Sequence, residues 1–368
     1  MHYKIALALS LLAACGDNHA SPGLDAPKPP APDSALVDAP PPTPTVKMTK
    51  TKLVGDEAGG ANTDPNLVNA WGIAFAPTGA IWVAANHTGK ATVYSAAGVP
   101  AALVVSIPVP AGVTDDPAPT GQVFNGTAAD FMGDKFILST ENGTVVGWQT
   151  GTTAAIRVDR SAAGANYKGL DILDAGVDGR VILGANFSLG TVSVWNKAYA
   201  PITLDGGAFV DPSLPAGYAP FNVMVSGTNV YVAYAMQDAE KHDDVSGPGI
   251  GAISVFDNTG KFVRRLVTGG DLNSPWAMAI APADFPQAAS GDLIVGNFGD
   301  GAIHAYDPTT GEKRANIVDA TGAPLQIPFL WALTFGKDAP NESHLSLFYT
   351  AGPAGETHGA LGRLDLAP

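Results

Sequence analysis

The side chains best suited to chemistry lie in one acidic loop, residues 237–249, which reads QDAEKHDDVSGPG. Four carboxylates and one imidazole fall within seven residues of it: Asp238, Glu240, His242, Asp243 and Asp244. Carboxylate oxygens suit Ca²⁺, and a carboxylate–imidazole mixture suits Zn²⁺ or Mn²⁺. We therefore expect calcium or another divalent cation on Asp238, Asp243 and Asp244, with His242 facing a ligand. The spacing matches neither an EF-hand nor a HExxH helix, so a solvated acidic loop or a hydrogen-bonded clamp are the alternatives.

A second group of polar side chains ends runs of apolar residues. These side chains are Asn86, Glu141, Asn186 and Asn297. Asn and Asp serve turns at strand ends, which is one explanation; a polar ring around a bound ligand is the other. A further carboxylate–imidazole pair, Glu356 and His358, lies near the end of the chain. We expect all of these side chains, with His242, to contact the ligand.

The sequence carries no recognisable catalytic signature. Ser274 is followed by proline and lacks a G-x-S-x-G elbow, and there is no phosphate-binding G-x-x-x-x-G-K-[ST] loop. These absences favour binding over catalysis, without deciding whether the protein is an enzyme.

An internal repeat of 48 to 55 residues must position these groups. Its first strand recurs six times, at 71–75, 120–124, 168–172, 221–225, 276–280 and 331–335. A second apolar strand follows at 81–86, 136–141, 181–186, 231–236, 292–297 and 346–351. A third strand begins with a small residue, and Asp/Asn/Gly turns lead from it to a fourth.

Six units of four strands predict an all-β fold, a six-bladed β-propeller with four-stranded blades. The last unit runs out of chain after three strands, so residues 50–54 are expected to close it. A linear solenoid would need capping repeats, which are not apparent. In a propeller, the loops that leave the second strands share one face around the axis. The polar strand ends and the acidic loop should therefore meet at one rim.

Composition agrees with this fold. Hydrophobic residues make up 46% of the 368 residues, and 43 Gly with 30 Pro suit short strands and turns. We expect one domain over residues 47–368, and a monomer. The net charge of −14 argues against nucleic acid as a partner.

The N-terminal segment has the pattern of an exported lipoprotein. Residues 1–14 have a short basic start and an apolar run too short to span a bilayer, which indicates a signal peptide. Cys15, the only cysteine, ends the lipobox-like LAAC, so we expect it to be lipidated. Residues 15–46 then form a Pro-rich disordered linker. This predicts a protein anchored in the bacterial cell envelope, in the outer membrane rather than the inner.

The body, from about residue 50 to 364, resembles a family of uncharacterised secreted bacterial propellers related to NHL-repeat proteins. The resemblance rests on stretches such as TDPNLVNAWGIAFAPTG (63–79), LNSPWAMAIAP (272–282) and GDLIVGNFGDG (291–301). It implies the fold but no established activity. Two functions stay open. The first is a binding or scaffold module whose top face takes a small molecule, glycan or protein. The second is a calcium-dependent, lactonase-like hydrolase or lyase at the central channel mouth, which rests largely on analogy of fold.

Overall fold

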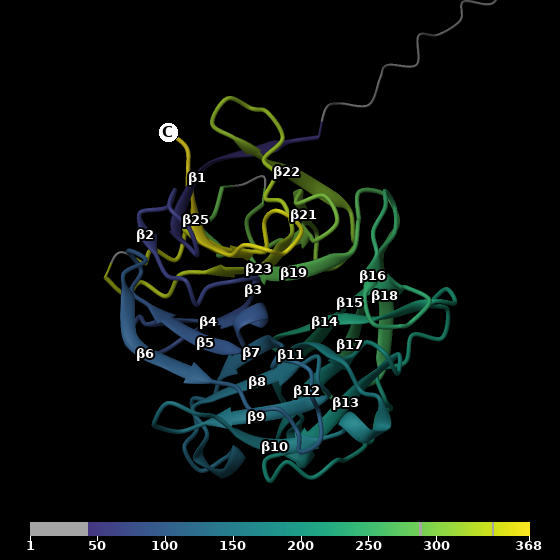
Figure 1. Cartoon of the computed structure of the whole chain (residues 1–368). Helices are drawn as coiled ribbons and strands as arrows, with labels where there is room; N and C mark the ends of the chain where they lie inside the picture. The colour runs from purple at the N-terminus through teal and green to yellow at the C-terminus, as the bar shows by residue number, and fades with distance from the viewer. Residues whose placement is uncertain (1–42, 287–288, 341) are drawn as a thin grey trace, which may run out of the picture. The chain divides into compact units, whose positions relative to one another are not determined.

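A computed structural model describes residues 43–286, 289–340 and 342–368. Residues 43–368 form one compact unit. Its sheets radiate around a centre, as Figure 1 shows, with β3, β7, β11, β14, β19 and β23 innermost. The described residues are all-β apart from four single-turn 3₁₀ helices, so the predicted six-bladed propeller is confirmed. These helices are η1 (Asn86–Thr88), η2 (Phe131–Gly133), η3 (Ser161–Ala163) and η4 (Gly176–Asp178).

The strands follow the predicted repeat from the innermost outward. The first two blades are β3 (Ala70–Phe75), β4 (Ile81–Ala85), β5 (Lys90–Tyr94) and β6 (Pro100–Ser106), then β7 (Pro119–Phe124), β8 (Phe136–Thr140), β9 (Thr144–Trp148) and β10 (Ala155–Asp159). The third and fourth are β11 (Tyr167–Asp174), β12 (Arg180–Asn186) and β13 (Thr191–Asn196), then β14 (Tyr218–Ser226), β15 (Asn229–Gln237), β17 (Ala252–Asp257) and β18 (Phe262–Thr268). The fifth and sixth are β19 (Pro275–Ile280), β20 (Leu293–Asn297), β21 (Ile303–Tyr306) and β22 (Lys313–Asp319), then β23 (Leu330–Phe335), β24 (Leu347–Ala351), β25 (Ala360–Leu366) and β1 (Thr45–Gly55).

The third blade departs from the predicted four strands, because its sheet contains three. The chain after β13 makes isolated bridges rather than a fourth strand, one between Trp195 and Pro201 and one between Leu204 and Gly207. Pro201 has no N–H to donate, so it interrupts a regular ladder of hydrogen bonds there. The loop of the fourth blade adds a short strand instead, β16 (Asp244–Val245), which pairs with the end of β15.

The strand β1 closes the ring as predicted and is longer than residues 50–54. It pairs antiparallel with β25 from Met48 to Gly55, which completes the sixth blade. Its first residues, from Thr45 to Met48, also pair in parallel with β22 of the fifth blade. The strand therefore starts at Thr45, two residues before the expected domain start at 47, because its first residues pair with β22.

The core lies between neighbouring blades. The middle strands β4, β8 and β20 are buried along their whole length, as their continuous apolar runs predict for strands covered on both faces. The inner strands approach one another closely at the axis. A Cβ on Gly121 would lie 2.6 Å from the backbone nitrogen of Leu170, so glycine permits this approach.

The expected signal peptide (1–14), Cys15 and most of the expected linker (15–46) lie outside the described residues. Within the described ranges, no helix has the length and apolar character needed to cross a membrane.

Candidate functional site

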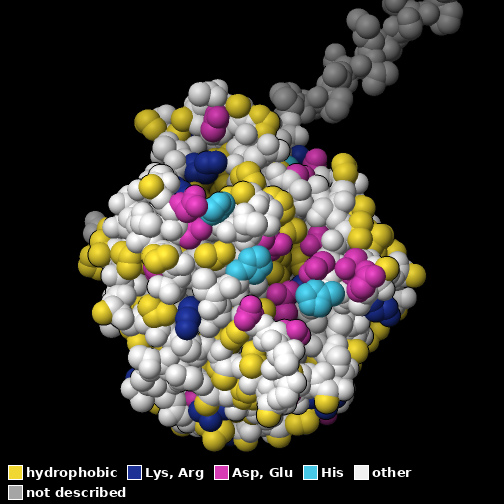
Figure 2. All heavy atoms as spheres, in the orientation of Figure 1, with side chains coloured by type: hydrophobic (Ala, Val, Ile, Leu, Met, Phe, Trp, Pro, Cys, Tyr) yellow, Lys and Arg dark blue, Asp and Glu magenta, His cyan; other side chains and the backbone are white. Residues whose placement is uncertain are grey.

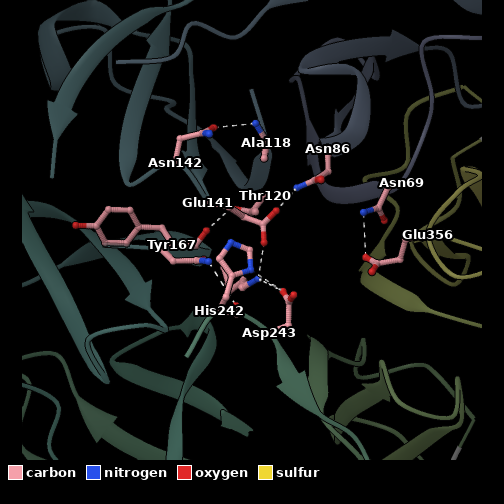
Figure 3. Close-up of polar contacts among 12 residues, drawn as sticks. Asn69, Asn86, Ala118, Thr120, Glu141, Asn142, Tyr167, His242, Asp243 and Glu356 are labelled. Atoms are coloured by element: carbon pink, nitrogen blue, oxygen red, sulfur yellow. Dashed lines mark hydrogen bonds and ion pairs between the residues drawn. The ribbon is translucent and has the colours of Figure 1, made fainter. Parts of the chain in front are cut away.

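A buried lysine lies at the centre of the site, at the start of the inner strand β11. The side chain of Lys168 is only 2% exposed. Its Nζ donates to Glu141 Oε1, from the residue that follows β8, and to Asp243 Oδ1 at 3.1 Å, from the acidic loop before β16. Figure 3 shows Glu141, His242 and Asp243 lying close together, although Glu141 belongs to another blade than His242 and Asp243. The lysine thus ties the acidic loop of the fourth blade to the second and third blades.

The pKa values of this cluster follow from its charges. Burial of Lys168 opposes its charge, but Glu141 and Asp243 outweigh burial and hold the pKa of Lys168 above its ordinary value. The hydrogen bond from His242 is the largest cause that holds the pKa of Asp243 well below its usual range. The positive charge of Lys168 lowers it further. Asp243 in turn raises the pKa of His242, whose Nδ1 lies 3.1 Å from Asp243 Oδ1. The Lys168 ammonium and the Asp243 carboxylate are therefore charged near neutral pH.

The second oxygen of Glu141 is held by an amide. Asn86 Nδ2 donates to Glu141 Oε2 at 2.9 Å and to the carbonyl of Pro119 at 3.3 Å. Asn86 is itself buried, at 2% exposure. The arrangement fixes the Glu141 carboxylate in one orientation, with one oxygen toward Lys168 and the other toward Asn86.

A second carboxylate lies across the mouth. Asn69 Nδ2 donates to Glu356 Oε1 at 2.9 Å, and Trp331 Nε1 donates to Asn69 Oδ1 at 2.9 Å. Burial raises the pKa of Glu356 to about 7. Asn69 and Glu356 both adopt left-handed backbone conformations, with φ of 50° and 67°, which non-glycine residues rarely take. Such backbone strain is common at functional sites.

Aromatic side chains from the inner strands form the floor of the mouth. Trp71 stacks on Trp331 with ring centroids 3.3 Å apart, and Trp276 meets Trp71 edge-on at 6.1 Å. Lys168 Nζ lies 5.5 Å from the centre of the Trp71 ring, and Trp276 Nε1 donates to the Lys168 carbonyl at 3.1 Å. The ammonium therefore rests on aromatic faces as well as between carboxylates.

A groove of about 440 Å³ opens beside this cluster. It lies between the loop before β7, the loop before β11 and the acidic loop. Its charged and ionisable lining residues are Asp115, Asp116, Glu141, Glu240, Lys241 and His242. Figure 2 shows Asp, Glu and His side chains gathered around the hollow at the centre of this face. The groove is predominantly acidic, and its volume suits a small organic ligand.

The predicted metal ligands divide into two groups. Among the described residues, one set has ligand atoms within 4.8 Å of one another, namely Glu141, His242 and Asp243. Asp238 instead accepts the backbone N–H of His242 at 2.8 Å, and Asp244 accepts the Ser246 hydroxyl at 2.7 Å, so both serve the loop itself. The Lys168 ammonium already contacts two of the three clustered residues. A divalent cation fits this set only if the ammonium moves away.

The remaining predicted ligand contacts are not gathered at the mouth cluster. Asn186 Oδ1 lies 3.4 Å from the backbone nitrogens of Asn166 and Leu189, as a turn-forming residue does. Asn297 Nδ2 donates to the carbonyl of Asp271 at 2.8 Å. His358 Nδ1 lies 2.8 Å from Asp56 Oδ2, so Glu356 and His358 contact different partners.

Two residues central to this geometry were absent from the predicted site, namely Lys168 and Trp331. One signal could have found Lys168. The residues that open the six inner strands are Trp71, Thr120, Lys168, Phe221, Trp276 and Trp331. Lysine is the one charged residue in this set, and a charge at a position enclosed by neighbouring blades requires a partner.

Comparisons with known proteins identify sequence relatives in a mimivirus and solved structures with a similar fold. No protein-family model matches the sequence. The uncharacterized protein R648 of Acanthamoeba polyphaga mimivirus is 32% identical over 311 residues, which cover 79% of this chain and 73% of that protein. The uncharacterized protein L690 of the same virus is 30% identical over 325 residues, 83% of this chain and 82% of that protein.

Among solved structures, the calcium-binding protein regucalcin from Agrobacterium tumefaciens aligns with a TM-score of 0.53 and 14% identity. The alignment covers 88% of this chain and 95% of regucalcin. At this identity the likeness concerns the fold alone. By sequence, the chain belongs to the protein family that includes the mimivirus proteins R648 and L690.

Proposed function

We propose that this protein is a ligand-binding module, and that its ligand places a cationic group in the acidic groove at the channel mouth. The observation that carries the proposal is the groove of about 440 Å³ beside Glu141, with Asp115, Asp116 and Glu240 in its wall. A groove in which one sign of charge predominates concentrates ligands of the opposite sign. The net charge of −14 adds to this field.

The fixed cluster beside the groove gives the site its shape. Glu141 is held between Lys168 and Asn86, so it presents a defined surface and needs little reorganisation on binding. The aspartates Asp115 and Asp116 belong to the loop before β7 and are exposed. We assign them the attraction of the cationic group, and Glu141 and His242 the positioning of the ligand.

Calorimetry with three probes tests this function. Spermidine should bind, whereas maltotriose and citrate should bind at least about 10-fold more weakly, a difference of about 1.4 kcal/mol. Replacing Asp115 and Asp116 together by asparagine should weaken spermidine binding by about 10-fold. Asp178→Asn, an exposed change in η4, is the control. Preference for citrate or maltotriose, or unchanged binding by the double variant, would refute the proposal.

We further propose that the module is tethered in the bacterial cell envelope by a lipid on Cys15, with residues 15–46 as a spacer. The support is the sequence pattern of the first 46 residues alone. Cys15→Ser should move the protein from the membrane fraction to the soluble fraction. If the variant stays with the membrane, the anchor proposal fails while the binding proposal stands.

A metal-dependent hydrolase or lyase is the second candidate, because Glu141, His242 and Asp243 have ligand atoms within 4.8 Å of one another. A cation there would polarise a carbonyl or activate water. The Lys168 ammonium competes with it for Glu141 and Asp243. Metal analysis of the purified protein decides between the two. A stoichiometric cation that is lost in Asp243→Ala would favour the metal-dependent enzyme. If the protein holds no such cation and its melting temperature does not respond to EDTA or Ca²⁺, this candidate is refuted.

A further inference from the structure

The central channel holds a second cavity, lined by the later residues of the inner strands. Its volume is about 510 Å³, within the range of small-molecule sites. Its wall includes the apolar side chains Met224, Met278 and Trp276, and the polar side chains Asp171 and Gln122. The exposed Lys337, which follows β23, also lines it. None of these residues belongs to the acidic groove at the mouth.

Asp171 is a carboxylate in this channel without a cation beside it. Its Oδ1 accepts the backbone N–H of Ile172 and its Oδ2 accepts that of Val225, each at 2.7 Å. These bonds fix the carboxylate between β11 and β14 and leave further lone pairs on both oxygens. In the parts of the chain that the structure describes, no lysine, arginine or histidine forms an ion pair with Asp171. Burial raises its pKa to about 6, so it is largely ionised at neutral pH.

Gln122 adds a second unused acceptor. Its Nε2 donates to the carbonyls of Gly72, at 3.1 Å, and Trp82, which fixes the orientation of the amide. Its Oε1 is buried and has no hydrogen-bond partner among the described residues. A buried acceptor without a donor costs free energy that a bound donor recovers.

We propose that this channel is a second binding site, and that it takes a small organic ammonium ion with an apolar body. The ammonium group donates to Asp171 and to Gln122 Oε1, which supplies the cation that Asp171 lacks and the donor that Gln122 Oε1 lacks among the described residues. The apolar body packs on Met224, Met278 and Trp276. A cation on an apolar body matches both parts of the wall, whereas an anion would face Asp171.

Isothermal titration calorimetry with three matched probes tests this site. The probes are 2-phenylethylammonium, 2-phenylethanol and phenylacetate, which share a ring and differ in the charge of the polar end. The ammonium should bind at least about 10-fold more tightly than the alcohol, and phenylacetate more weakly still. Asp171→Asn should remove this preference. Asp174→Asn, an exposed change at the end of the same strand, should retain it.

Asp171→Asn places an amide N–H₂ opposite a backbone N–H and can lower stability, so a second variant is needed. Met224→Trp fills the channel from a half-buried position and keeps Asp171. It should abolish binding of the ammonium probe, while spermidine binding at the mouth should persist. Equal binding of the three probes, or ammonium binding that persists in Met224→Trp, would overturn the proposal. In the latter case the amine binds elsewhere on the protein.

Discussion

Two loops in corresponding positions carry the same kinds of side chain and use them in opposite ways. Each joins the second and third strands of its blade, in blade four and in blade six, and each contains a carboxylate and an imidazole. In blade four, Asp243 forms an ion pair with buried Lys168 and contacts His242. In blade six, Glu356 receives an amide hydrogen bond from Asn69, while His358 pairs with Asp56.

The difference shows that the groups in contact with each carboxylate, more than the residue type, set its pKa. A hydrogen bond from His242 and the nearby ammonium lower the pKa of Asp243, whereas burial with only an amide donor raises that of Glu356 to about 7. At neutral pH, one loop therefore carries a fixed negative charge and the other a carboxyl group near its midpoint. The mouth combines a permanent charge with a titrating one.

Lys168→Met should give the largest effect on this comparison. It leaves Glu141 and Asp243 without their cation, so we expect a loss of about 3–5 kcal/mol in the free energy of unfolding, measured with denaturant. Added Ca²⁺ should restore part of the loss in the variant and leave the wild type unchanged. Lys261→Met, at an exposed position, is the control. A loss below about 1 kcal/mol would show that the ion pairs do not hold the loop.

Glu356→Gln should change the pH dependence of stability. An unfolded glutamate titrates near its ordinary pKa of about 4.3, while Glu356 in the folded protein titrates near 7. The folded state therefore binds more protons between these values, and its stability falls as pH rises through this window. The variant lacks this fall, so above pH 7 it should gain about 1–3 kcal/mol over the wild type, relative to the difference at pH 4.

Melting temperatures from pH 4 to pH 8.5 measure this gain. Glu240→Gln, an exposed change in the acidic loop, checks that removal of any carboxylate near the mouth does not produce the same result. Parallel pH profiles for wild type and Glu356→Gln would contradict the burial argument.

Asp243→Asn should have a smaller effect on stability, about 1 kcal/mol or less, because its side chain is 67% exposed. Its clearer effect is on His242, whose pKa should fall because Asp243 is the main cause of its elevation. An NMR titration of the imidazole measures this fall. Asp244→Asn is the matched control, since Asp244 bonds Ser246. An unchanged His242 titration in Asp243→Asn would contradict the assigned contact.

His358→Asn should have the smallest effect. The side chain is 35% exposed and pairs with Asp56, so we expect a change of about 0.5 kcal/mol in stability. Spermidine affinity should also stay unchanged, as calorimetry can show. A loss of affinity would show that His358 contacts the ligand, as the sequence analysis expected for Glu356 and His358 together.

The repeat made the architecture predictable from sequence. Six spaced apolar strands with turn residues between them predict the blades, and the missing strand after residue 366 predicts closure by the N-terminal segment. The parallel contact between β1 and β22 was not predictable, because a pairing between distant segments leaves no local pattern. The three-stranded third blade was not predictable, because the repeat predicts four strands in every blade.

The site was predictable only in part. The acidic loop and Glu141 stand out by composition, and the structure brings Asp243, His242 and Glu141 together. Lys168 begins a first strand, whereas the predicted site residues lie at the ends of second strands and in the loops that follow them. The separate partners of Glu356 and His358 depend on left-handed backbone at Glu356, which the sequence GETH does not reveal.

The position of β1 has a consequence for the order in which the protein folds. The strand leaves the ribosome before every other strand of the domain, yet its antiparallel partner β25 leaves last. Until β25 emerges, the edge of β1 that pairs with it lacks the hydrogen bonds of the finished ring, and the sixth blade cannot form. Contacts between such distant segments are slow to form, so ring closure should set the refolding rate. A strand exposed for that time is also a point where two unfinished chains can pair with each other.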